Sequence, residues 1–247
     1  LVRSRGLGDV YKRQGEAIEQ LKTLLNRDKT DLRTYLALGG VYAQDKNFAD
    51  AAKIYDAAVE QIKSPERKDW PVFYQRGIAH ERLKEWDQAE PNFKKALELY
   101  PDQPQVLNYL GYSWVDRGEN LDEALLMIKK AVELRPQDGY IVDSLGWAYY
   151  QLGRYPEAVV ELEKAVKLRP EDPTINDHLG DAYWRADRQL EATFQWNHAI
   201  AGKPEPEELA KIEEKLKSGL ADPANPAQAD AAKPDAAKPE TEKPAAN

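Results

Sequence analysis

The chain of 247 residues repeats one pattern at a spacing of about thirty-four residues. The most regular copy consists of Val142, Leu145, Gly146, Tyr149, Ala158, Leu162, Ala165 and Pro170. The next copy places Asn176, Leu179, Gly180, Tyr183, Ala192, Trp196, Ala199 and Pro204 at the same positions, each displaced by 34 residues. Internal repetition at this period predicts a solenoid, in which every unit packs mainly on its neighbours.

Each copy predicts two helices. Tyr35, Leu38, Gly39 and Tyr42 follow the spacing i, i+3, i+4 and i+7, so these four residues form one buried helical face. The glycine permits a second helix to cross closely at that point. Prolines end the second helix of four copies, because a proline removes a backbone donor and clashes with the preceding turn; they are Pro101, Pro136, Pro170 and Pro204.

Alignment on the Leu-Gly pair divides the chain into a series of units. We expect five complete units at about 31–64, 69–101, 102–136, 137–170 and 171–204. Residues 15–30 supply a second helix only, as a truncated half repeat, and residues 205–220 form a C-terminal capping helix. Residues 221–247 consist almost entirely of Ala, Pro, Asp, Lys and Glu, which predicts a disordered tail.

The segment 1–14 shows no repeat pattern and resembles a non-native leader translated from a sequencing adapter. It carries four basic residues and one acidic residue, so the remainder of the chain is more acidic than the whole, whose net charge is −8. The only methionine is Met127, and we therefore expect the true N-terminus to be missing. A cytoplasmic and a periplasmic or cell-envelope location both remain open.

These residues carry a resemblance to the tetratricopeptide-repeat (TPR) family over residues 15–204, and the fourth and fifth units most resemble those of bacterial members. The resemblance implies an all-α fold, a right-handed α-α superhelix of helix-turn-helix repeats. It also implies a scaffold for protein-protein interaction, with the first helix of each unit lining a concave groove.

Signatures of other functions are missing from the sequence. There is no cysteine, and His80, His178 and His198 lie in different units without the spacing of metal ligands, so we expect no metal site and no cofactor. Phosphate-binding and catalytic motifs are absent, and we expect no enzyme. An acidic chain without a basic surface is also unsuited to nucleic acid, and no apolar run is long enough to span a membrane.

The groove positions differ from unit to unit and are the candidate binding residues. They are Tyr74 in the second unit; Asn108 and Tyr112 in the third; Asp143, Trp147 and Tyr150 in the fourth; and Asp177, Asp181 and Trp184 in the fifth. Aromatic residues dominate interface hot spots and charges steer encounter, so this strip predicts a protein or peptide partner with apolar and basic anchors. Family members that bind acidic chaperone C-termini use Lys and Asn at these positions, and this chain lacks that basic clamp.

Two alternatives remain open at this level. The repeats are an interaction region severed from an upstream catalytic domain, or the chain is a self-assembling structural component of a cell-envelope complex. In the second case the N-terminal half repeat at Ala17–Leu25 stacks its apolar face on another chain. The aromatic side chains of the groove also have a structural alternative, which is packing between neighbouring helices.

Overall fold

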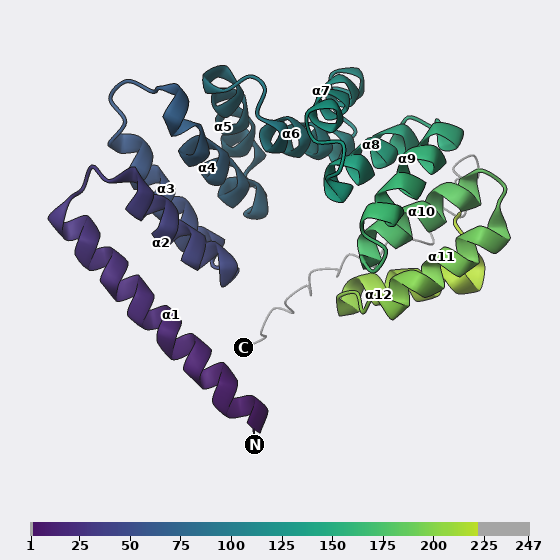
Figure 1. The fold of residues 1–247 in the computed structure, drawn as a ribbon, viewed down its shortest axis with the longest axis horizontal. Helices are drawn as coiled ribbons and strands as arrows, with labels where there is room; N and C mark the ends of the chain where they lie inside the picture. Colours follow the sequence, from purple (N-terminus) through teal and green to yellow (C-terminus); the bar gives the residue numbers. More distant parts are fainter. Residues whose placement is uncertain (1, 222–247) are drawn as a thin grey trace, which may run out of the picture.

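The computed structural model describes residues 2–221, with side chains from residue 14 onward. Within this range the chain forms twelve α-helices and one short 3-10 helix, which confirms the all-α prediction. Figure 1 shows the helices following one another around an arch, with α1 and α12 at its two ends. The tail expected at 221–247 lies, except for Ala221, outside the described residues.

Five helix pairs make up the body of the arch. The first helices of the pairs are α2 (Leu32–Gln44), α4 (Trp70–Arg82), α6 (Pro104–Arg117), α8 (Gly139–Gln151) and α10 (Pro173–Arg185). The second helices are α3 (Phe48–Glu60), α5 (Trp86–Leu99), α7 (Leu121–Leu134), α9 (Tyr155–Leu168) and α11 (Gln189–Ala201). The 3-10 helix η1 (Arg67–Asp69) lies in the longer connection between the first and second pairs.

The repeated glycine marks the point where the two helices of a pair cross. A methyl group on Gly146 of α8 would lie 2.5 Å from Leu162 Cγ in α9, too close for any real contact. A methyl group on the corresponding Gly111 of α6 would lie 2.8 Å from Ile128 Cγ1 in α7. Both opposing side chains are fully or almost fully buried. The glycine is therefore required for helix packing within each pair.

A residue with left-handed backbone geometry lies in the turn between the two helices of each pair. Gly153 occupies this position in the fourth pair with φ 71°, where glycine has no steric penalty. Lys46, Lys84 and Asp187 adopt φ values of 57°, 63° and 59° at the equivalent place, although they carry a Cβ atom. The packed helix pair thus fixes the turn geometry whichever residue stands there.

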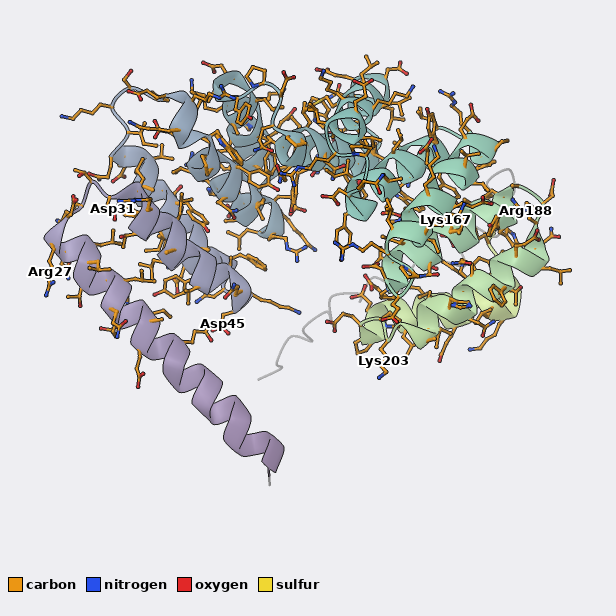
Figure 2. All side chains as sticks on the ribbon, viewed as in Figure 1. Arg27, Asp31, Asp45, Lys167, Arg188 and Lys203 are labelled. Atoms are coloured by element: carbon orange, nitrogen blue, oxygen red, sulfur yellow. The ribbon has the colours of Figure 1, made fainter. Side chains whose placement is uncertain are left out.

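The N-terminal helix α1 spans Val2–Arg27 and is longer than the half repeat expected at 15–30. No proline interrupts it, and the structure continues it through the segment that the sequence pattern excluded. Leu25 of α1 packs beside Tyr35 of α2, while Leu24 points outward. Figure 2 shows Arg27 and Asp31 at the turn between α1 and α2, with Asp45 at the far end of α2.

Helix α12 (Pro206–Ser218) follows the last pair and covers its open side. Figure 2 shows Arg188 and Lys203 at the two ends of α11. After Lys203 the chain turns back and enters α12. Ile212 of α12 is fully buried in the cluster formed by Leu179, Tyr183 and Trp196. The apolar surface of the fifth pair is therefore closed by the same chain.

Candidate functional site

The first helices line the inner side of the arch. Neighbouring first helices contact one another, α2 with α4, α6 with α8 and α8 with α10, whereas comparable contacts between neighbouring second helices are absent from residues 2–221. The array therefore bends toward its first helices. Their inward faces form the concave groove, which we define by the nine groove positions predicted from the sequence.

At the C-terminal end of the groove, α12 occupies the predicted binding positions. The Nζ atom of Lys215 lies 2.8 Å from a carboxylate oxygen of Asp177 and 2.8 Å from one of Asp181. Trp184 packs in the same cluster as Leu216. Asp181 was expected to be exposed and is instead 6% exposed, because α12 lies against α10. These three positions therefore contact the chain's own C-terminal helix.

This contact shifts the pKa values of Asp181 and Lys215. Burial raises the pKa of Asp181 to about 6, with Asp177 adding to the shift and Lys215 opposing it. Burial lowers the pKa of Lys215, but the attraction of Asp181 and Asp177 outweighs it and the pKa is raised overall. The ammonium group of Lys215 thus opposes the effect of burial and favours the ionised form of Asp181.

In the middle of the groove, the predicted residues of α8 form a contact with α10. His178 Nδ1 lies 3.0 Å from Asp143 Oδ1, and its ring stacks on Trp147 with a centroid distance of 4.1 Å. Trp147 stacks in turn on Tyr150 at 4.7 Å with an interplanar angle of 7°. Asp143, expected to face the groove freely, is 6% exposed because His178 covers it. The pattern of first-helix positions did not identify His178.

The His178–Asp143 pair should make stability depend on pH. Burial lowers the pKa of His178, but the attraction of Asp143, together with smaller contributions from Asp181 and Asp177, outweighs burial and raises the pKa above 6.5. The charged form therefore stabilises the folded chain below pH 6.5, and this contribution is lost as pH rises through the raised pKa. We expect a higher urea midpoint at about pH 6 than at about pH 8, and a smaller difference in the His178→Gln variant.

The part of the pH dependence that remains in the His178→Gln variant has a second source. The raised pKa of Asp181 acts in the same direction, since the folded chain then binds a proton more tightly than the unfolded chain. An Asp181→Asn variant should remove this remainder. Identical pH profiles for the parent chain and both variants would exclude the assignment.

Two buried polar atoms at the α6 and α8 positions of the groove lack partners. Both atoms are inaccessible to solvent. Asn108 Oδ1 accepts no hydrogen bond from a described residue, and Trp147 Nε1 donates none to one. Tyr74, by contrast, packs among aromatic side chains, with Trp70 and Tyr109 both at 5.9 Å between ring centroids. Burial raises the pKa of Tyr74 to about 12. Tyr74 thus serves the packing of α4 against α6.

A cleft of about 380 Å³ opens beside Tyr112, between α6 and the end of α4. Its lining combines aromatic, acidic and basic side chains: Glu81, Arg82, Lys84, Trp86, Tyr109, Tyr112, Ser113, Asp116 and Arg117. Tyr109 donates a hydrogen bond of 3.0 Å to Glu81. Burial raises the pKa of Tyr112, and Asp143 and Asp116 add to the shift. No other segment of residues 14–221 fills this cleft.

The sequence pattern predicted only part of this cleft. The helical spacing of the groove positions predicted Tyr112, and Asp116 lies one helical turn further along the same helix. Lys84 and Trp86 come from the turn and second helix of the preceding unit. They were not predicted, because the prediction considered only positions on first helices. Two basic side chains of the lining are held by their own neighbours. Arg117 lies 2.8 Å from Glu119, and Arg82 lies over Phe48.

The described part of the chain shows neither a metal-ligand cluster nor a membrane-spanning helix. Residues 14–221 contain no cluster of three or more His, Asp or Glu side chains arranged to hold a metal ion. Among the helices of residues 2–221, none combines the length and hydrophobicity needed to cross a bilayer.

The fold and the groove define a class, that of helical-repeat solenoids, and comparison with known proteins identifies the family. Family models described as tetratricopeptide repeat match residues 30–102 and 74–139, and a model described as TPR repeat matches residues 146–187. The chain belongs to the tetratricopeptide-repeat family. A comparison with curated protein sequences finds no match.

Solved structures with the same fold come from several sources. The chain is similar to MamA from Desulfovibrio magneticus RS-1, with a TM-score of 0.58 and 22% identity over 70% of this chain and 94% of that one. Pseudomonas aeruginosa PilF gives a TM-score of 0.62 and 20% identity over 78% and 89%. The APC/C hetero-tetramer Cut9–Hcn1 gives 0.71 and 17% identity over 85% of this chain and 40% of that one. At these identities the likeness shows the fold alone.

Proposed function

We propose that the chain is a protein-interaction scaffold that binds a partner segment in the concave groove, at the cleft beside Tyr112. The TPR repeats support the general role of an interaction scaffold. The observation that carries the specific proposal is the contact made by α12. There Lys215 of α12 forms ion pairs with the acidic groove positions Asp177 and Asp181. The same helix buries its apolar residue Ile212 against the fifth helix pair.

The cleft offers the same chemistry without an occupant from residues 14–221. Tyr112, Tyr109 and Trp86 supply aromatic surface, which dominates the energy of protein interfaces. Glu81 and Asp116 supply carboxylates, and neither forms an ion pair with a described residue. We infer that a helical or extended segment inserts an apolar anchor beside Tyr112 and directs a Lys or Arg side chain to Asp116 or Glu81.

A randomised peptide library selected on the immobilised full chain tests this proposal. The selected peptides should combine an aliphatic or aromatic residue with a nearby Lys or Arg. In fluorescence anisotropy, Tyr112→Ala should weaken their binding by about tenfold or more, as expected for a hot spot. Asp116→Asn should reduce the preference for the basic residue.

The control is Lys167→Ala, in the second helix α9, which should leave affinity unchanged. Asp143→Ala is not a suitable variant, because Asp143 is buried against His178 and its loss would alter stability. Peptides without a basic residue, or peptides whose affinity survives Tyr112→Ala, would contradict the proposed site.

A further inference from the structure

The outer side of the arch carries a row of exposed apolar residues at the repeat spacing. Leu126 in α7, Val160 in α9 and Phe194 in α11 are separated by 34 residues each, and they are 67%, 52% and 65% exposed. Leu190, one helical turn before Phe194, is 87% exposed. Single exposed apolar residues are ordinary on a protein surface, but recurrence at equivalent positions in the second helices of three successive pairs indicates an interaction surface.

Charged residues flank this row on both sides. Three residues before each apolar position stands a carboxylate, at Glu123, Glu157 and Glu191. Four residues after it stands a basic or titratable side chain, at Lys130, Lys164 and His198. At 1.5 Å per residue, the carboxylates lie about 4.5 Å toward the helix start and the bases about 6 Å toward its end. The outer face therefore consists of an acidic, an apolar and a basic row, which we call the three-row face.

We propose that the three-row face binds a second copy of this chain. A twofold axis along the apolar row would reverse the helix direction of the partner. Each apolar position would then meet its own counterpart, and each carboxylate would lie opposite a base. An axis across the row would place carboxylates opposite carboxylates, so a single arrangement satisfies both the apolar and the charged rows.

The unpaired charges of this face come mainly from α7. Glu157 and Glu191 form ion pairs with Arg154 and Arg188, and Lys164 pairs with Glu161. Glu123 and Lys130 form no ion pair with a described residue. The contact centres on α9, because Val160 is the middle position of the apolar row, with α7 and α11 on either side.

Sedimentation equilibrium of the full chain tests the proposal. We expect a monomer–dimer equilibrium that Val160→Glu shifts toward monomer by about tenfold or more in the dissociation constant. The control is Leu24→Glu in α1, which should leave the dimer unchanged. A chain that stays monomeric up to about 1 mM overturns the proposal. A dimer that Leu24→Glu abolishes and Val160→Glu does not would assign self-association to the N-terminal helix instead.

Charge reversal on α7 tests the twofold arrangement itself. Glu123→Lys and Lys130→Glu should each weaken the homodimer, since each places like charges opposite one another. Mixing the two variants should restore association as a heterodimer, and the double variant should restore the homodimer. Circular dichroism verifies that every variant is folded. If mixing restores no association although both single variants weaken the homodimer, the twofold arrangement is wrong.

Discussion

Replacing Lys215 with methionine should lower the free energy of unfolding by roughly 3 kcal/mol, the lower end of the range for breaking a buried ion pair. The substitution retains most of the side-chain volume but leaves Asp177 and Asp181 facing each other without a cation. Helix α12 should then separate from α10. Urea unfolding followed by circular dichroism measures the loss, and amide hydrogen exchange measures the local release of α12.

The effect of this variant should depend on pH in a defined direction. Without Lys215, repulsion by Asp177 raises the pKa of Asp181 beyond its value of about 6, so protonation relieves the repulsion as pH falls. The stability difference from the parent chain should therefore be smaller at about pH 5 than at about pH 8.

A matched control lies on the same helix. Lys211 pairs with Glu207 on the exposed side of α12, and Lys211→Met should cost no more than about 0.5 kcal/mol. Equal losses for the two lysine variants would show that the contact of Lys215 with the groove carboxylates does not hold α12 in place.

Two adjacent glycines of α2 should respond in opposite directions to the same substitution. Gly39→Ala should destabilise the chain by about 1–3 kcal/mol, because the new methyl group would overlap the ring of Tyr55, which is almost fully buried. Gly40→Ala should stabilise it by about 0.5–1 kcal/mol, because nothing lies within 4 Å and alanine favours the helix. Thermal and urea unfolding of both variants measure the difference.

Comparing these two variants separates the effect of helix propensity on stability from the effect of helix packing. The two glycines share one helix, differ by one position and receive the same methyl group. A stabilising Gly39→Ala variant would mean that the first pair does not cross as closely as the structure shows. The same comparison applies to Gly146 of α8, where the opposing residue is Leu162.

The sequence was sufficient to predict the fold because the relevant contacts are local and repeated. The small residue at Gly146 and the facing Leu162 are only 16 positions apart, and their spacing recurs along the chain. Helical periodicity then identifies the buried face of each helix without reference to distant residues. Membership in the TPR family followed from the same positions.

The predicted binding strip was less well determined for a physical reason. Helical register shows that Asp143, Asp177 and Asp181 belong to first helices, but it does not show what covers them. Asp143 meets His178 across 35 residues, and Asp177 meets Lys215 across 38. Such pairs depend on how successive units are placed relative to one another.

The sequence by itself therefore determined the repeat, the helix pairs and the glycine crossings, since these depend on periodic contacts within a unit and with its neighbour. Only the tertiary structure decided which part of the groove is open. Helix α12 fills the end at Asp181, His178 closes the middle over Asp143, and the cleft beside Tyr112 remains accessible. The reason is that the curvature of the array brings side chains from different units together, and no single repeat encodes that curvature.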